Sequence, residues 1–261
     1  MSITREKLDR LYDLYNNRKF VHPDPLEFLY AYHDIREREL AGLIASSLAY
    51  GRVTQILKSV SSVLEKMVPS PRSFLLDSTP KTLFACFSGF RHRFTTGDEM
   101  AYMLLGAKQA IERYGSLYDC FLAGFNEQND SIVPAISAFV NELNSAAAEE
   151  VNSLLPSPER GSACKRINLF LRWMVRKDRV DPGGWDKVPR SMLIIPLDTH
   201  MYHICTGLNM TCRKSADMTT AVEITEAFRK IAPEDPVRYD FSLTRLGIRK
   251  DADPDSFLRY C

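Results

Sequence analysis

The chain has 261 residues, a length that fits one large domain or two closely packed ones. Its 34 basic and 33 acidic residues leave a net charge of +1, so a strongly charged partner would have to meet a local patch. The six cysteines lack zinc or iron–sulfur spacing, and neither a signal peptide nor a run of about 18 apolar residues is recognisable. We therefore expect a soluble, cytoplasmic, reduced protein that contacts no membrane and carries neither a metal nor another cofactor.

Helical periodicity dominates the chain, and alternating strand patterns are nearly absent. Helices are predicted over about 4–16, 25–33, 36–48, 53–67, 98–111, 117–125, 132–148, 162–177, 198–208, 217–230 and 239–246. The stretch 36–48 is apolar enough to be buried on several sides. Residues 87–94 are predicted to form an aromatic and basic loop. The sequence predicts an all-α fold of about ten to fourteen helices with short links.

Basic residues cluster in the segment 160–179, where seven cations accompany one acid, Asp178. The cations are Arg160, Lys165, Arg166, Arg172, Arg176, Lys177 and Arg179. Lys165, Arg172 and Arg176 are seven and then four residues apart, so they share a helical face. Such a stripe suits a phosphate backbone, although a solvated helix face around a core accounts for the same residues.

Asp198 follows an apolar segment, 193–197, and lies at the predicted start of a helix. As an isolated residue it is explained as a helix cap. Lys165 suggests a second role, because a desolvated lysine at a helix start can become a nucleophilic amine. The aspartate could then deprotonate that amine or a water, or stabilise a developing sugar cation. Their separation of 33 residues leaves open whether the two side chains touch.

Two other groups of residues allow alternative interpretations. Asp198, His200 and His203 could ligate a metal, although a helix-start role for His200 needs no metal. The segments Phe90–Phe94 and Tyr50–Arg52 mix aromatics with arginines, as surfaces that stack bases and contact phosphates do; core aromatics with surface arginines give the same pattern. Trp185 follows two glycines on a loop where it could cover a cleft or pack inside the protein.

The segment Pro196-Leu197-Asp198-Thr199-His200-Met201 resembles the one that carries the catalytic aspartate of the helix-hairpin-helix DNA glycosylase superfamily. Residues 161–166, followed by an apolar helix, resemble that superfamily's hairpin and the helix carrying the Schiff-base lysine of its bifunctional members. The interval from Lys165 to Asp198 is most similar to the archaeal 8-oxoguanine glycosylase branch. The whole chain also resembles an uncharacterised bacterial family related to that superfamily, through residues 48–52, 172–176 and 235–241.

The chain departs from the glycosylase pattern in three ways. Pro158-Glu159-Arg160-Gly161 replaces the usual glycine-rich hairpin, and the iron–sulfur cysteines of some members are absent. A shift of one residue in the alignment would put Arg166, instead of Lys165, at the lysine position. Arginine stays charged and forms no Schiff base, so the enzyme would then be monofunctional or inactive.

The resemblance implies two helical domains with a cleft between them, one formed by residues 37–176 and the other by 1–36 together with 177–261. It implies a monomeric base-excision glycosylase, with or without AP-lyase activity, that removes an oxidised purine such as 8-oxoguanine from double-stranded DNA. Lys165 would attack the sugar, with Asp198 as its partner. The alternatives are a non-catalytic nucleic-acid-binding protein and a metal-dependent hydrolase.

The resemblance and the residue patterns together assign further expected contacts. The residues expected to bind the substrate base are Trp185, Tyr50, Arg52 and His200. The residues expected to contact the DNA backbone are Arg166, Arg172, Arg176, Arg91 and Arg93.

Overall fold

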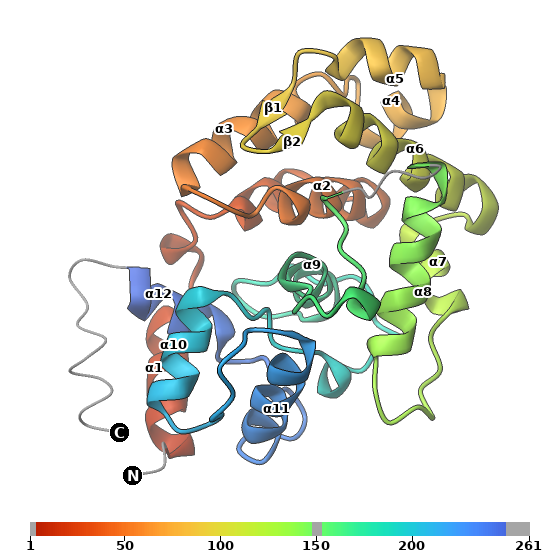
Figure 1. The fold of residues 1–261 in the computed structure, drawn as a ribbon. Helices are drawn as coiled ribbons and strands as arrows, with labels where there is room; N and C mark the ends of the chain where they lie inside the picture. The colour runs from red at the N-terminus through yellow and green to blue at the C-terminus, as the bar shows by residue number, and fades with distance from the viewer. Residues whose placement is uncertain (1–3, 148–152, 249–261) are drawn as a thin grey trace. The chain divides into compact units, whose positions relative to one another are not determined.

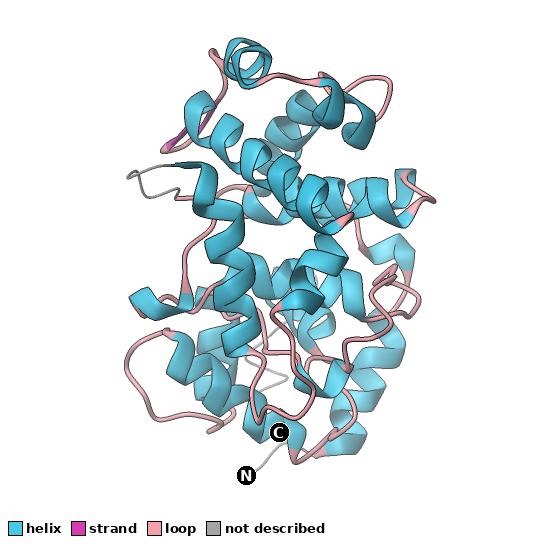
Figure 2. Cartoon of the chain, turned by 90° about the vertical axis from the view of Figure 1, so that its right-hand side faces the viewer, coloured by secondary structure: helices cyan, strands magenta, loops and turns pink. Residues whose placement is uncertain are grey.

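The computed structural model describes residues 4–147 and 153–248 (Figure 1). Helices account for most of this part of the chain, and its strands form a single two-stranded antiparallel hairpin (Figure 2). The predicted mainly helical class is therefore confirmed. The chain divides into two compact units, Pro23–Arg160 and the segments on either side of it. We call them the middle unit and the terminal unit.

The middle unit begins with a 3-10 helix, η2 (Pro25–Ala31), and contains most of the helices. They are α2 (Ile35–Ser47), α3 (Val53–Leu64), α4 (Pro71–Asp77), α5 (Pro80–Phe87), α6 (Gly97–Tyr114), α7 (Leu117–Ala123) and α8 (Val133–Asn144). Strands β1 (Arg91–His92) and β2 (Thr95–Thr96) lie between α5 and α6, and the short 3-10 helices η3 (Ser145–Ala147) and η4 (Pro158–Arg160) follow α8.

Local sequence signals set the ends of α6, the longest of these helices. Thr96 accepts a hydrogen bond from the Glu99 amide while the Glu99 side chain accepts one from the Thr96 amide, which is a capping box. Gly115 ends the helix at a φ of +94°, a left-handed conformation that favours glycine. Between these ends α6 packs against α5, α7 and α8. A Cβ atom at Gly106 would lie 1.8 Å from the Leu143 carbonyl oxygen, so α6 and α8 approach closely there.

The core of the middle unit includes α2, as the sequence predicts. Leu40, Leu43 and Ile44 are fully buried, and α2 packs against η2, α3, α4 and α7. Glu39 is also fully buried, and its carboxylate accepts hydrogen bonds from the amides of Leu117 and Tyr118 at the start of α7. The carboxylate is thus placed where the helix dipole favours negative charge.

The terminal unit combines the two ends of the chain. Its elements are α1 (Arg5–Tyr15), η1 (Arg18–Phe20), α9 (Lys165–Val175), η5 (Arg190–Met192), α10 (Thr199–Gly207), α11 (Met218–Arg229) and α12 (Asp240–Ile248). Helix α12 packs against both α1 and α10. Helix α9 contributes Phe170, Trp173 and Met174 to the core, each fully buried.

Two segments lie in different units from those that the resemblance implies. Helix α9 belongs to the terminal unit, not to the middle one, because Arg172 and Arg176 pair with carboxylates of that unit. The segment 23–36 belongs to the middle unit, where η2 packs on α2.

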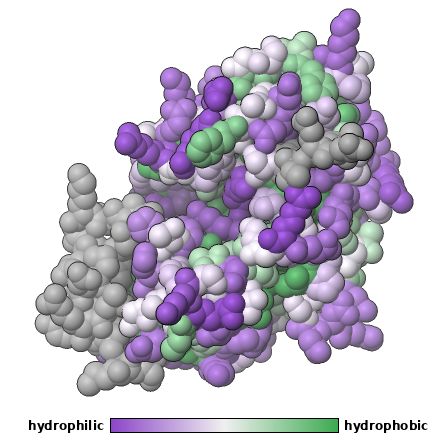
Figure 3. Space-filling model, viewed as in Figure 1, coloured by the Kyte–Doolittle hydropathy of each residue, from purple (hydrophilic) through white to green (hydrophobic). Residues whose placement is uncertain are grey.

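The surface seen in Figure 3 is mostly hydrophilic, and hydrophobic residues form separate patches on it. None of the helices in the described part of the chain combines the length and the apolar character needed to cross a membrane.

Candidate active site around Lys165 and Asp198

Lys165 and Asp198 lie together in the terminal unit, each at the start of a helix. The Lys165 Nζ atom is 3.2 Å from the Asp198 Oδ2 atom. Both side chains keep some contact with solvent, with exposed fractions of 31% for Lys165 and 25% for Asp198. The pairing that the sequence leaves open is therefore present, and Lys165 is the residue whose amine meets the carboxylate.

An unusual turn before α9 positions Lys165. Cys164 precedes the helix at a φ of +48°, a left-handed conformation that is uncommon for a residue other than glycine. The Cys164 amide donates to Ser162 Oγ over 3.1 Å, and Asn168 Nδ2 donates to the Ala163 carbonyl over 3.1 Å. These side chains hold the turn in place of an N-cap side chain, so Lys165 becomes the first residue of the helix.

A buried extended segment positions Asp198. Residues Leu193, Ile194, Ile195 and Leu197 are buried, and the Ile195 amide donates to Thr225 Oγ1 of α11 over 3.0 Å. Asp198 then caps α10, because its Oδ1 atom accepts a hydrogen bond of 2.9 Å from the Met201 amide. One carboxylate oxygen thus caps the helix while the other faces the lysine.

The surroundings of Asp198 favour its ionised form. Burial alone would raise the pKa of its carboxyl group, but the positive charge of Lys165 and the hydrogen bond from the Met201 amide outweigh burial and lower it below the ordinary value. The carboxylate is therefore a fixed negative charge beside a primary amine. This arrangement can accept a proton from the amine or from a water, and it can stabilise a positive charge that develops nearby.

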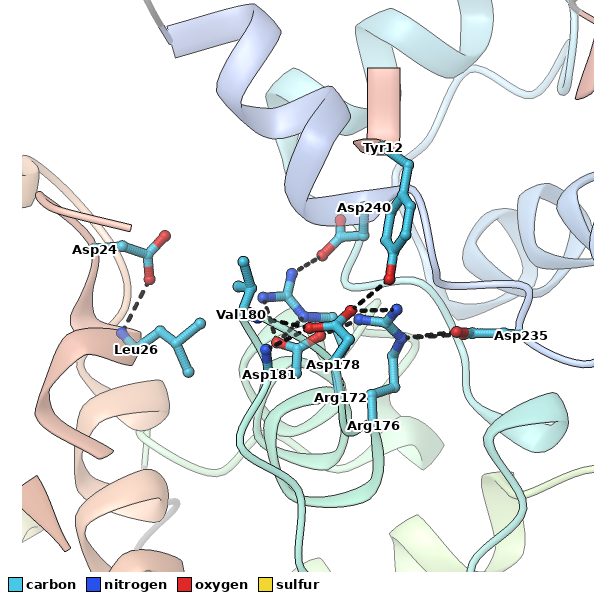
Figure 4. A network of polar contacts seen from close by, with 10 residues as sticks. All are labelled: Tyr12, Asp24, Leu26, Arg172, Arg176, Asp178, Val180, Asp181, Asp235 and Asp240. Atoms are coloured by element: carbon cyan, nitrogen blue, oxygen red, sulfur yellow. Dashed lines mark hydrogen bonds and ion pairs between the residues drawn. The ribbon is translucent and has the colours of Figure 1, made fainter. Parts of the chain in front are cut away.

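A buried network of charges lies along the same helix, where Arg172 and Arg176 meet four carboxylates (Figure 4). Arg172 donates to Asp181 and to Asp240, the first residue of α12. Both guanidinium groups are almost completely buried, with 4% and 3% of their side chains exposed.

Arg176 holds the other side of this network. Its guanidinium donates to Asp181, to Asp178 over 2.9 Å and to Asp235 over 3.0 Å. Tyr12 of α1 adds a hydrogen bond of 2.9 Å to Asp178, so the network connects α1 to the end of α9. In this way the network joins segments of the terminal unit that are distant in sequence.

These contacts contradict the prediction that Arg172 and Arg176 bind DNA phosphates. The prediction is wrong because each guanidinium is buried and its donors are directed at aspartates of the same unit. The partners were not predicted, because only Asp178 lies both close to the arginines in sequence and in the same cluster of charged residues. Asp181 follows in the next loop, only five residues after Arg176, and this short separation in sequence could have predicted their ion pair.

Burial and the paired charges shift the pKa values of the carboxyl groups in this network in different directions. Burial raises the pKa of Asp181 to about 6 despite the neighbouring Arg172 and Arg176. Burial also raises the pKa of Asp240. For Asp178 burial acts in the same direction, but Arg176 and two backbone amides outweigh it and lower its pKa.

The position of the Trp185 side chain contradicts a second prediction, namely that this residue lines a pocket for the base. Its indole ring is fully buried and packs edge to face on Phe170, with ring centroids 5.1 Å apart. The loop that carries it folds back onto α9, because the Gly183 amide donates to the Trp173 carbonyl and the Trp185 amide to the Met174 carbonyl. Trp185 therefore belongs to the core of the terminal unit.

His200 and His203 are exposed on α10, and the interaction with His200 contributes to the lowered pKa of Asp198. Within the described residues, no three or more histidine, cysteine, aspartate or glutamate side chains are grouped in a way that could hold a metal. The metal-site interpretation of Asp198, His200 and His203 is therefore wrong. Arg166 is half-buried beside Lys165, and its contact with a DNA backbone stays a prediction.

The remaining residues predicted to bind DNA belong to the middle unit. Arg91 and Arg93 are exposed on the β1–β2 hairpin, and exposed Arg52 is the N-cap residue that precedes α3. Tyr50 is half-buried, and its hydroxyl donates to the His92 carbonyl over 2.8 Å. Tyr50 thus supports the hairpin, and a role for it or Arg52 in base binding stays a prediction.

Comparison with known proteins gives one match. A family described as "Protein of unknown function (DUF2400)" matches residues 24–249, which is most of the chain and includes both Lys165 and Asp198. No curated protein and no solved structure matches the chain. The function must therefore be argued from the site.

Proposed function

The chain belongs to the DUF2400 family of unknown function, and we propose that it is a DNA base-excision enzyme whose reaction centre is formed by Lys165 and Asp198. The observation that supports this proposal is the 3.2 Å contact between the Lys165 amine and the Asp198 carboxylate. The resemblance to the DNA glycosylases suggests the roles, with Lys165 as the nucleophile and Asp198 as the catalytic aspartate.

The proposed reaction begins with a damaged nucleotide extruded from the DNA helix. Asp198 accepts a proton from the Lys165 ammonium, and the free amine attacks C1′ of the sugar. A bond forms between Nζ and C1′ while the bond between C1′ and the base breaks, and the departing base takes the proton from Asp198. The regenerated Asp198 carboxylate stabilises the positive charge that develops on the sugar and its attached amine.

The covalent product then determines whether the DNA strand is cut. Opening of the sugar ring gives a Schiff base between Lys165 and C1′, which can lose the 3′ phosphate by β-elimination. Water hydrolyses the Schiff base and returns the lysine. An oxidised purine such as 8-oxoguanine in duplex DNA is the substrate class that we propose, on the resemblance alone.

Borohydride trapping tests this proposal directly, because the reagent reduces a Schiff base to a stable protein–DNA adduct. Duplexes containing 8-oxoguanine, other oxidised purines or an abasic site would be incubated with the wild type, Lys165→Ala, Asp198→Asn and Arg166→Ala. We expect the wild type to be trapped and Lys165→Ala to give no adduct. Asp198→Asn should slow base release by about 100-fold or more, because it removes a general base and a stabilising charge.

Arg166→Ala is the matched control, since it removes a neighbouring cation on the same helix turn. At a DNA concentration that saturates binding it should retain trapping, because losing the predicted phosphate contact lowers affinity but leaves the Lys165 amine in place. An adduct lost in Arg166→Ala but kept in Lys165→Ala would remove Lys165 from the proposed role. If the wild type releases no base from any duplex of the panel and forms no adduct with abasic DNA, the enzyme proposal fails. Salt-dependent DNA binding without excision would then leave the non-catalytic alternative.

A further inference from the structure

The β1–β2 hairpin of the middle unit ends in a two-residue turn formed by Arg93 and Phe94. The Phe94 side chain is 79% exposed, although it is entirely apolar. Arg93 adopts a φ of +54°, in the left-handed region. Two-residue hairpin turns usually contain glycine, asparagine or aspartate, because these residues adopt positive φ at low cost. The turn therefore carries residue types that its own geometry does not favour, as binding sites often do.

Hydrogen bonds fix the two strand residues that flank the turn, His92 and Thr95, while the turn itself faces solvent. The buried His92 ring lies 2.9 Å from Ser59 Oγ of α3 through Nδ1, and 3.0 Å from the Tyr50 carbonyl through Nε2. Tyr50 also hydrogen bonds through its hydroxyl to the buried Thr95, over 2.6 Å. These contacts come from three different segments, so Phe94 projects from a supported base.

Arginines accompany the exposed ring on the hairpin and at the start of the adjoining helix α3. Arg52, Arg91 and Arg93 are all exposed, and in the described part of the chain none of the three forms an ion pair with a carboxylate. The Arg93 guanidinium lies 5.4 Å from the centre of the Phe94 ring. Gly51 places the α3 start against this arginine, because a Cβ atom there would lie 2.7 Å from Arg93 Cδ.

Two acidic residues, Asp98 and Glu99, follow the hairpin directly in the first turn of α6. The Glu99 carboxylate accepts hydrogen bonds from the amides of Thr96 and Ser153, so its charge is already engaged with backbone donors. Asp98 is exposed on the first turn of the helix, where the helix dipole favours its charge.

We propose that this hairpin tip is a nucleic-acid contact at which Phe94 stacks on an unpaired base while the arginines bind the flanking phosphates. A polynucleotide fits both features, because it offers apolar base faces at regular intervals along a polyanion. A single ring offers too little apolar surface to hold a protein at a lipid membrane. The inference rests on the proposed function, since an enzyme that extrudes a base must contact unstacked DNA.

Fluorescence anisotropy of labelled oligonucleotides tests this contact without requiring catalysis. The ligands would be a single strand, the matched duplex, and a duplex with one unpaired adenine. We expect Phe94→Ala and Phe94→Leu to weaken binding of the single strand and the bulged duplex by about 5- to 100-fold. Binding of the matched duplex should change less, because its bases are already stacked.

The matched control for the ring is Leu14→Ala, which shortens another exposed apolar side chain, 58% exposed on α1. It should leave affinity unchanged. For the charges, Arg91→Gln should reduce the slope of log affinity against log salt concentration by about the amount expected for one phosphate contact. Lys81 is an exposed cation of α5, and Lys81→Gln should leave this slope unchanged. With 2-aminopurine as the unpaired base, the wild type should quench its fluorescence and Phe94→Leu should not.

The outcomes separate this inference from the proposed function. Equal affinities for the wild type and both Phe94 variants, with trapping intact, overturn the hairpin contact and leave the enzyme proposal standing. Ring-dependent binding in a protein that neither releases a base nor traps an adduct supports the hairpin contact and ends the enzyme proposal. Binding to phosphatidylserine vesicles that requires Phe94, with no oligonucleotide binding, overturns the nucleic-acid assignment.

Discussion

Replacing Arg176 by methionine should strongly destabilise the terminal unit. The methionine keeps most of the side-chain volume but removes a charge that contacts Asp178, Asp181 and Asp235. The wild-type network has two arginines and four aspartates, a formal excess of two negative charges; without Arg176 the excess is three. Removing one partner of a buried ion pair costs about 3–5 kcal/mol, because the remaining charges stay desolvated and unpaired.

Tryptophan fluorescence during urea unfolding measures this loss in the relevant part of the molecule. The chain has only two tryptophans, Trp173 and Trp185, and both are buried in the terminal unit. The midpoint and slope of the transition give the free energy of unfolding of that unit. Lys177→Met is the control, since it removes the exposed cation next in sequence and should change stability by less than about 0.5 kcal/mol.

The destabilisation should depend on pH in a defined direction. The pKa of Asp181 is raised to about 6, so this carboxyl group is mostly protonated in the folded protein at pH 5. Losing the arginine should therefore cost less at pH 5 than at pH 8, where Asp181 is charged. A loss below about 1 kcal/mol at pH 8 would refute the structural role. Unchanged stability together with weaker DNA binding would restore the phosphate-contact prediction for Arg176.

Two further predictions concern the other elements of the fold. The lowered pKa of Asp198 means that its charge stabilises the folded state above the unfolded pKa, about 4, and that this contribution is lost as the pH falls through the folded value. The stability difference between the wild type and Asp198→Asn, followed by tryptophan fluorescence, should therefore shrink from pH 7 to pH 2; a difference that grows would contradict the ion-pair account. Gly106→Ala should lower the stability of the middle unit by about 1–3 kcal/mol or more, because its methyl group would meet the Leu143 carbonyl. Thermal melts by circular dichroism would compare it with Gly89→Ala, where nothing lies within 4 Å; equal shifts would argue against the close approach of α6 and α8.

Local patterns in the sequence were sufficient to predict most of the helices. Residues 98–111, for example, show the periodicity of a helix, and the structure places α6 over Gly97–Tyr114. A helix depends on contacts between residues three and four apart, so a short window contains most of the information. The hairpin at 91–96 was missed because each strand has only two residues, too few to show an alternating pattern.

The sequence also supplied the two residues of the candidate site, through the resemblance of the segments around Lys165 and Asp198. It did not supply their distance, which depends on how α9 and α10 pack within the terminal unit. The sequence also left a one-residue uncertainty between Lys165 and Arg166; in the structure the Lys165 amine meets the carboxylate, after the left-handed turn at Cys164.

The basic segment shows most clearly what the tertiary structure decided. The sequence determined a helix with Arg172 and Arg176 on one face, and from charge alone that face suggested a polyanionic partner. The structure brings Asp235 and Asp240 to these arginines from 59 and 68 residues away. The net charge of a sequence segment describes only residues that are neighbours in the sequence. Burial and ion pairing depend on which distant segments fold against each other.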